Sequence, residues 1–475
     1  MIQVICREET DIYNAYHITK AFYPSAEVTS QIEEKASNYV TVMVDGKAAA
    51  SVAVEEIRES CAKNRKHLLD TLLYRQLERQ TGRSLSWGVL TGVRPVKLAL
   101  QKLTDGMGQD EFVRWFGESY LVSREKSELA WQVAGREKAL LDRLDMKDGY
   151  SLYVGIPFCP TVCSYCSFSS GELSAWKGRI DDYLDALCRE LCFIASESAG
   201  KRINTIYIGG GTPTTLSETQ LERLLSCIGA YFPREHLLEF TVEAGRADSI
   251  TRGKLSVLKR HGVTRISINP QTMQQKTLDE IGRRHTVGEV KEAFSLARSM
   301  GFDNINMDVI AGLPGETLAD VKDTLRQIEQ LCPDNLTVHS LAIKRAARME
   351  RHDDESAGRI GAMIEEAACA AGRMGMLPYY LYRQKNIAGN FENVGYAKVD
   401  KAGIYNILIM EEKQSIIAAG AGASTKILLK NAQPLPGSKK RKITNLIRQE
   451  NVKAVDAYIS RIDEMIERKG EWLWR

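Results

Sequence analysis

Three cysteines within eight positions are the residues of this sequence whose spacing most directly suggests chemistry. Cys159, Cys163 and Cys166 form a Cys-x3-Cys-x2-Cys pattern in the run GIPFCPTVCSYCSF, directly after an apolar, strand-like segment. Short spacers allow one loop to turn three thiolates toward a common centre. Thiolates are the ligands that soft metals and iron-sulfur clusters prefer. The pattern therefore predicts a soft metal or cluster site.

The same triplet admits two other interpretations. A structural zinc site needs four ligands, and the next thiol, Cys188, lies far along the chain on the apolar face of a predicted helix. Buried structural thiols are the third interpretation. Three cysteines on a four-iron cluster would leave one iron open to an exchangeable ligand, so we expect a cluster here. We expect the other seven cysteines to be reduced structural thiols: Cys6, Cys61, Cys188, Cys192, Cys227, Cys332 and Cys369.

Polar residues recur where other predicted strands end. The run GGGTPT follows the strand-like NTIYI, and residues without Cβ let backbone N–H groups approach an anionic ligand. Glu243, Gln271 and Asp308 lie on the polar face of three successive strands, where they could bind an ammonium group or hydroxyls. Arg283 could hold a carboxylate with both arms of its guanidinium group. The neighbouring Arg284 and His285 are interpreted as positive charges that decorate a helix C-terminus.

Six strand candidates separated by helical patterns must position these residues. Alternation of strands and helices predicts parallel pairing through crossovers. In residues 304–310, apolar and polar side chains alternate, whereas a doubly wound sheet would be apolar on both faces. We therefore expect an α/β fold with a partial (β/α)6 barrel whose polar interior opens near the strand C-termini. The candidates are residues 151–156, 204–209, 237–244, 264–270, 304–310 and 335–341.

Three domains are expected. Residues 1–147 form an N-terminal α+β domain of unknown role, 148–375 form the core, and 376–475 form a C-terminal accessory domain with a basic run, 439–442, that reads as a solvated loop. Lys and Arg total 64 against 61 Asp and Glu, which argues against a nucleic-acid binder. No apolar run is long enough to span a membrane and no signal peptide is evident. We expect a cytoplasmic protein.

Five runs carry a family resemblance. They resemble, in order, motifs of the radical S-adenosylmethionine (SAM) superfamily and, within it, of the oxygen-independent coproporphyrinogen III oxidase family. The resemblance is clear over residues 150–345, and the run SWGVLTGVRPVKL is most similar to the HemZ branch, the coproporphyrinogen dehydrogenases. The five runs are YVGIPFCPTVCSYCSF, YIGGGTPTTLS, TVEAG, NPQTMQQKTLDEIGRRHT and NMDVIAGLPGET.

The resemblance implies roles for individual residues. Cys159, Cys163 and Cys166 would bind a 4Fe-4S cluster. One or two SAM molecules would contact a further set: Tyr153, Tyr165, Gly210, Gly211, Thr212, Glu243, Gln271, Arg283, Asp308 and Ala342. Candidates for binding substrate propionates are Lys344, Arg345 and Arg348.

The resemblance also implies an activity. A 5'-deoxyadenosyl radical from reductive cleavage of SAM would decarboxylate the propionates of coproporphyrinogen III oxidatively to vinyl groups, giving protoporphyrinogen IX. The implied partners are this tetrapyrrole and a low-potential electron donor such as flavodoxin or ferredoxin. Phe168 stands where some decarboxylating members carry a cysteine, and GIYNILIM lacks the His and Trp of the haem motif of the haem-chaperone branch. Neither branch is matched cleanly, so haem binding or transfer, against which the missing His counts, and radical modification of haem stay open as alternatives.

Overall fold

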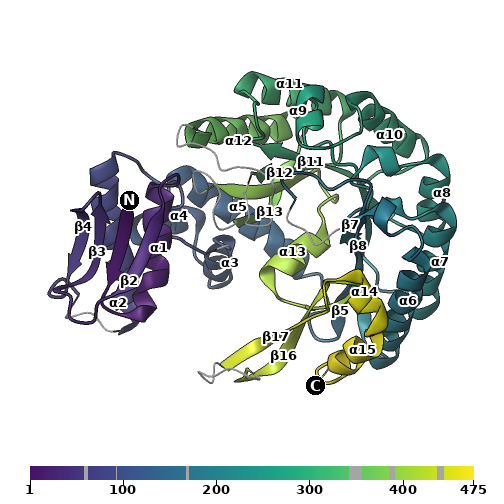
Figure 1. Cartoon of the computed structure of the whole chain (residues 1–475), viewed down its shortest axis with the longest axis horizontal. Coiled ribbons are helices and arrows are strands. Elements are labelled where there is room, and N and C mark those ends of the chain that lie inside the picture. The colour runs from purple at the N-terminus through teal and green to yellow at the C-terminus, as the bar shows by residue number, and fades with distance from the viewer. Residues whose placement is uncertain are drawn as a thin grey trace.

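An eleven-stranded sheet curves through the computed structural model, with helices along its outer side (Figure 1). The structure describes residues 1–57, 62–92, 94–166, 171–341, 356–383, 391–435 and 443–474. The strand order is β13-β14-β12-β11-β10-β9-β8-β5-β15-β16-β17. Its middle consists of six parallel strands: β5 (Gly149–Ile156), β8 (Arg202–Gly210), β9 (Glu239–Glu243), β10 (Arg265–Ser267), β11 (Ile305–Ala311) and β12 (Asn335–Ser340). The six predicted strands and their parallel pairing are confirmed.

The crossover helices begin where the sequence provides caps. Ser217, Thr286 and Thr317 each accept a hydrogen bond from the backbone amide three residues on, and the side chain of that residue accepts one from the amide of the cap. These capping boxes fix where three helices start after a strand and its loop. The helices on the outer side are α6 (Ile180–Glu197), α7 (Glu218–Tyr231), α8 (Arg252–Arg260), α10 (Val287–Ser299), α11 (Leu318–Leu331) and α12 (Ser356–Arg373).

The strand register separates an apolar face from a polar one. Ile266 of β10 pairs with Val242 of β9 on one side and Ile305 of β11 on the other, and all three side chains are buried. The next position of the register aligns Glu243, Ser267 and Asn306, which border the interior. The apolar face packs on the outer helices and the polar face looks inward. The α/β partial-barrel fold is confirmed.

The chain after residue 376 extends both edges of this sheet. At one edge, antiparallel strands β13 and β14 follow β12, and at the other β15 runs parallel to β5 and continues into an antiparallel hairpin. The elements are β13 (Leu377–Arg383), β14 (Glu392–Ala397), α13 (Ile404–Glu411), β15 (Ser415–Ala419), β16 (Ser424–Pro434), β17 (Ile443–Glu450), α14 (Val455–Ser460) and α15 (Ile462–Gly470). The basic run 439–442 lies outside the described residues.

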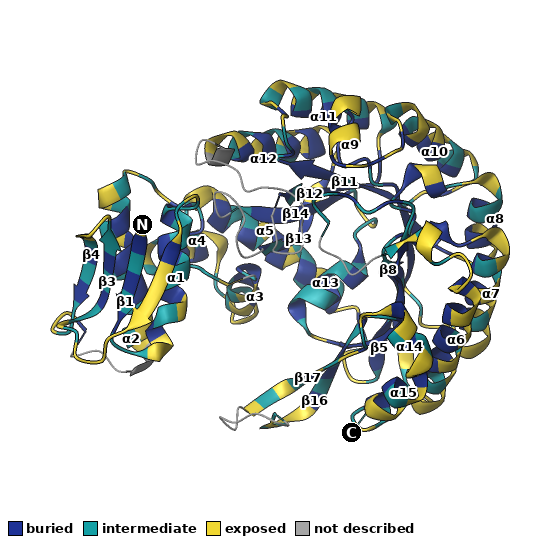
Figure 2. Cartoon of the chain, viewed as in Figure 1, coloured by how far each residue is buried: buried dark blue, intermediate teal, exposed yellow. Residues whose placement is uncertain are grey.

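The N-terminal residues form a second sheet of four strands in the order β2-β1-β3-β4, with its own buried core (Figure 2). Strand β2 shows no apolar alternation in the sequence, because four of its five residues are exposed. The elements before the main sheet are β1 (Ile2–Cys6), α1 (Glu9–Phe22), β2 (Val28–Ile32), β3 (Asn38–Val44), β4 (Lys47–Ala53), α2 (Ala62–Thr81), α3 (Val96–Thr104), α4 (Gln109–Tyr120) and α5 (Arg124–Leu141). Helix α5 packs on β13. None of the described helices is both long and apolar enough to cross a bilayer.

Candidate active site

A cavity of about 610 Å³ opens inside the curved sheet, at the carboxyl ends of the parallel strands. This volume falls in the range of about 300–1,000 Å³ that is usual for ligand sites. The predicted residues that line it together are Tyr153, Cys159, Cys163, Tyr165, Cys166, Gly210, Gly211, Thr212, Glu243, Gln271, Arg283 and Asp308. Outside the described residues lie Ala342, Lys344, Arg345, Arg348 and Phe168.

The cysteine loop is held against the segment that follows α9 (Gln275–Glu280). Cys159 ends the short strand β6 (Phe158–Cys159), which pairs with β7 (Gly171–Glu172). The Ser164 amide donates to the Ile281 carbonyl at 3.1 Å, and the Thr161 hydroxyl donates to the Gly282 carbonyl at 3.1 Å. These two hydrogen bonds hold the loop where its cysteines line the cavity.

The three thiols line one cavity, where they could hold a cluster. In a four-iron cluster each cysteine binds a different iron, so three sulfurs on the wall of the same cavity suit it. Two buried guanidinium groups, Arg246 and Arg283, border the same cavity and would balance the negative charge of three thiolates. No cysteine among the described residues forms a disulfide.

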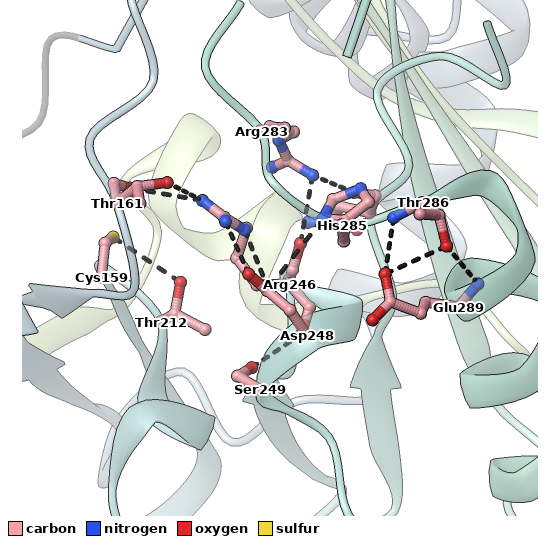
Figure 3. A network of polar contacts seen from close by, with 12 residues as sticks. Cys159, Thr161, Thr212, Arg246, Asp248, Ser249, Arg283, His285, Thr286 and Glu289 are labelled. Atoms are coloured by element: carbon pink, nitrogen blue, oxygen red, sulfur yellow. Dashed lines mark hydrogen bonds and ion pairs between the residues drawn. The ribbon is translucent and has the colours of Figure 1, made fainter. Parts of the chain in front are cut away.

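The glycine-rich turn after β8 lies directly on the cysteine loop. The Gly211 amide donates to the Ile156 carbonyl and the Thr212 amide to the Phe158 carbonyl, both at 2.7 Å. A Cβ at position 211 would come within 2.5 Å of the Phe158 carbonyl oxygen and 3.0 Å of Cys159 Sγ, so only glycine permits this approach. The Thr212 hydroxyl lies 3.6 Å from the same sulfur (Figure 3). The glycine-rich turn and the cysteine loop thus form one wall of the cavity.

Glu243 sits beside three stacked tyrosines. The Tyr207 hydroxyl donates to Glu243 Oε1 at 2.5 Å, and the Tyr207 ring stacks on Tyr405 at 4.4 Å and on Tyr153 at 6.2 Å between centroids. Burial raises the pKa of Glu243 to about 7, although the Tyr207 hydrogen bond opposes the increase. Tyr207 and Tyr405 were not among the residues predicted for the site. Tyr207 follows the inward parity of its strand, whereas Tyr405 comes from α13 and carried no such signal.

Asp308 and Gln271 are fixed by different means. Burial would raise the pKa of Asp308, but His339, 3.6 Å away, and the Asn306 amide, which donates at 2.7 Å, hold it below its ordinary value. Gln271 has a φ of +67°, and its backbone bonds to the Asp308 carbonyl and the Ile310 amide, both at 2.9 Å. Its Oε1 is buried without a hydrogen-bond partner among the described residues. An amide oxygen in this state needs a donor from a ligand or water.

His285 corrects a prediction. The sequence suggested an exposed positive charge at a helix end, and Arg284 is indeed exposed, but His285 is fully buried. Burial, together with nearby Arg283 and Arg246, lowers the pKa of His285 to about 3, so the ring is neutral. The prediction failed because the segment after α9 folds inward behind the cysteine loop. Arg283 donates to the Asn269 and Gly245 carbonyls.

Two buried arginines in the cavity wall were missed. Arg246 contacts the cysteine loop, as described below. Arg265 on β10 is 2% exposed, and its Nε and Nη2 have no hydrogen-bond partner in the described ranges. Arg265 pairs with Thr241, one layer below the Glu243–Ser267 pair, so it lies at the floor of the cavity. Its inward parity with Ser267 was the available signal.

Comparisons with known proteins agree with this geometry. The family model described as Radical SAM superfamily matches residues 153–328. The oxygen-independent coproporphyrinogen-III oxidase-like protein HemZ of Bacillus subtilis is 42% identical over 374 residues, which cover 77% of this chain and 75% of that protein.

Two further similarities are more limited. The heme chaperone HemW of Bacillus subtilis is 38% identical over 195 residues, 41% of this chain and 51% of HemW, so the match spans about half of that relative. The solved structure of coproporphyrinogen III oxidase (HemN) from Escherichia coli aligns with a TM-score of 0.52 at 21% identity, covering 70% of this chain and 72% of that one. At this identity the structural match supports the fold.

Proposed function

Because the chain belongs to the radical SAM superfamily and to its HemN-type family, which includes HemZ, we propose that it decarboxylates the propionates of coproporphyrinogen III to vinyl groups without oxygen. The product would be protoporphyrinogen IX. The observation that carries this proposal is Arg265. Nε and Nη2 of its buried guanidinium group have no hydrogen-bond partner among the described residues, and a carboxylate is the group that best pairs with two such donors.

The position of Arg265 favours a substrate that reacts. A propionate held there would lie one strand layer below Glu243, which we assign to SAM binding, and so next to the reacting centre. Coproporphyrinogen III carries four propionates and haem carries two, so Arg265 supports a carboxylate-bearing tetrapyrrole inside the sheet, and the incubation described below separates the two.

We assign Cys159, Cys163 and Cys166 as ligands of a 4Fe-4S cluster. The proposed SAM contacts are Tyr153, Tyr165, Gly210, Gly211, Thr212, Glu243, Gln271, Arg283, Asp308 and Ala342. When bound, the reduced cluster and SAM would supply a 5'-deoxyadenosyl radical that removes a β-hydrogen from the propionate. Loss of carbon dioxide, and of one electron to a one-electron acceptor, would then leave the vinyl group.

The chain's own residues position the reactants and exclude water. Because Gly211 has no side chain, the turn can approach the cysteine loop closely, and the methionine end of SAM would lie beside it. Asp308, whose pKa is kept low, stays ionised at neutral pH and can pair with an ammonium group. The stacked rings of Tyr153, Tyr207 and Tyr405 form an aromatic wall that keeps water from a reactive radical.

The wider organisation follows the same proposal. Residues 148–375 would form the radical SAM core and 376–475 an accessory domain that adds strands to both edges of the core sheet. The role of residues 1–147 is left unassigned. The proposed partner is a low-potential electron donor such as flavodoxin or ferredoxin, and the proposed location is the cytoplasm.

Two alternatives belong to the same family. The 38% identity to HemW favours haem binding and transfer as the second candidate, and radical modification of haem is the third. Anaerobic incubation with coproporphyrinogen III, haem, SAM and a reductant, analysed by mass spectrometry, separates them. Loss of carbon dioxide from coproporphyrinogen III supports the proposal, whereas stoichiometrically bound unchanged haem or modified haem refutes it.

The cluster assignment has its own test. Cys163→Ala should abolish both the iron-sulfur absorbance and the release of 5'-deoxyadenosine from SAM. Cys188→Ala, which removes a half-buried thiol on α6 outside the cavity, should retain both. If Cys163→Ala retains them, the assignment is wrong.

A further inference from the structure

Arg246 connects three parts of the site. It follows β9, is only 3% exposed, and borders the cavity. Its Nη1 donates to the Thr161 carbonyl at 3.2 Å and to the Thr161 hydroxyl at 3.0 Å (Figure 3). The same nitrogen lies 3.9 Å from Cys163 Sγ. One guanidinium nitrogen therefore touches both the backbone of the cysteine loop and the sulfur at its centre.

The orientation of this guanidinium group is fixed from behind. Asp248 accepts from Arg246 Nε at 3.1 Å and from Nη2 at 2.8 Å, a bidentate pairing that leaves Nη1 directed at the loop. The Ser249 hydroxyl donates to the Arg246 carbonyl at 2.7 Å and lies 2.6 Å from the Thr214 hydroxyl. The backbone that carries Arg246 is thus tied to the end of the glycine-rich turn.

His285, which lies near Asp248, does not compete with Arg246 for this carboxylate. His285 Nδ1 lies 4.0 Å from Asp248 Oδ1, beyond hydrogen-bond distance, and neither ring nitrogen has a hydrogen-bond partner among the described residues. Since the ring is neutral, Arg246 is the positive group that the Asp248 carboxylate holds. Asp248 therefore holds Arg246 in the orientation in which it contacts the cysteine loop.

We propose that Arg246, oriented by Asp248, is a positioning residue that shapes the Cys159–Cys166 loop for the cluster and raises the cluster's reduction potential through an N–H bond to Cys163 Sγ. The inference rests on the proposed cluster site. Reduction adds negative charge to the cluster, and a buried positive group with an N–H aimed at a ligand sulfur stabilises the more negative state. The cluster would then accept an electron from a weaker donor.

The test compares Arg246→Gln with Arg260→Gln. Arg260 is an exposed arginine on α8, and its side chain pairs with Glu222 on α7 rather than with the cysteine loop. Reconstituted proteins are titrated anaerobically and the reduced cluster is followed by electron paramagnetic resonance. At the potential that half-reduces the wild type, Arg246→Gln should show a roughly tenfold lower ratio of reduced to oxidised cluster, about 59 mV for one electron. Arg260→Gln should match the wild type.

Two further variants keep the test decisive if Arg246→Gln assembles no cluster. Arg246→Lys keeps the positive charge but loses the two-armed guanidinium group, and Asp248→Asn keeps that group but weakens its orientation. Each should lower the reduction potential by less than Arg246→Gln does. Hydrogen exchange of the cluster-free proteins should also show faster exchange over residues 159–166 in Arg246→Gln than in Arg260→Gln.

The outcomes separate this inference from the proposed function. Unchanged potential and unchanged exchange in the Arg246 and Asp248 variants overturn the inference and leave the cluster site intact. A wild type that binds no cluster refutes the proposed function itself. A lowered potential with normal iron content supports the inference whichever tetrapyrrole is the substrate.

Discussion

The carboxyl group of Glu243 makes stability depend on pH in a way that can be calculated. Burial raises its pKa from the ordinary 4.5 to about 7 in the folded protein. The unfolded chain releases this proton near pH 4.5, whereas the folded chain keeps it until about pH 7. Folding therefore becomes less favourable as the pH rises from 4.5 to 7, and the cost stays constant above pH 7.

The size of this cost follows from the pKa change. At about 1.36 kcal/mol per pKa unit, raising the pKa from 4.5 to about 7 costs about 3 kcal/mol above pH 7. At pH 5 most of the cost is absent, and less than about 1 kcal/mol remains. Glu243→Gln keeps the shape and an oxygen that can accept the Tyr207 hydroxyl, but it has no charge to bury.

Urea unfolding of the cluster-free protein checks the calculation. The free energy of unfolding of Glu243→Gln minus that of the wild type should rise from under about 1 kcal/mol at pH 5 to about 3 kcal/mol at pH 8. Because only the difference between two proteins at one pH is used, other titrating groups cancel. A difference that stays flat from pH 5 to pH 8 would refute the claim that this carboxyl is protonated by burial.

Three other outcomes are expected. SAM affinity measured by calorimetry should rise more steeply from pH 6 to pH 8 in the wild type than in Glu243→Gln, because the ionised Glu243 carboxylate attracts the positively charged SAM more strongly than the protonated carboxyl does; equal slopes contradict this. Gly211→Ala should lower the iron bound per chain several-fold in an iron assay, since its Cβ cannot fit at 2.5 Å from a carbonyl oxygen, whereas Gly178→Ala, with no atom within 4 Å, should match the wild type. Lys126→Met should lower the free energy of unfolding in urea by about 3–5 kcal/mol, because it leaves Glu392 buried without the ion pair that now measures 2.8 Å. Adding Glu392→Gln to Lys126→Met should recover part of that loss, and no recovery would argue against an unpaired charge as the cause.

Much of the fold could be predicted because its patterns are local. The alternation of apolar and polar residues in 304–310 depends only on the two-residue period of a strand, and the structure reproduces it in β11. The caps at Ser217, Thr286 and Thr317 are equally local. Strand β2, with its exposed residues, gave no such pattern.

The edges of the main sheet could not be predicted in this way. Strand β15 lies beside β5 although some 260 residues separate their sequences, and no local pattern specifies such a neighbour. The prediction that His285 is exposed failed for the same reason. Its sequence context resembles an exposed helix end, and only the packing of the segment behind the cysteine loop removes it from water.

The sequence by itself determined the kind of chemistry, because the spacing of Cys159, Cys163 and Cys166 and the glycine-rich turn are short-range features. The tertiary structure decided which side chains surround those groups. Arg246 stands 83 positions from Cys163, and Tyr405 comes from the far C-terminal part to stack on Tyr207. Such contacts arise from strand register and helix packing between distant segments, so they set the charge and shape of the site without leaving a motif in the sequence.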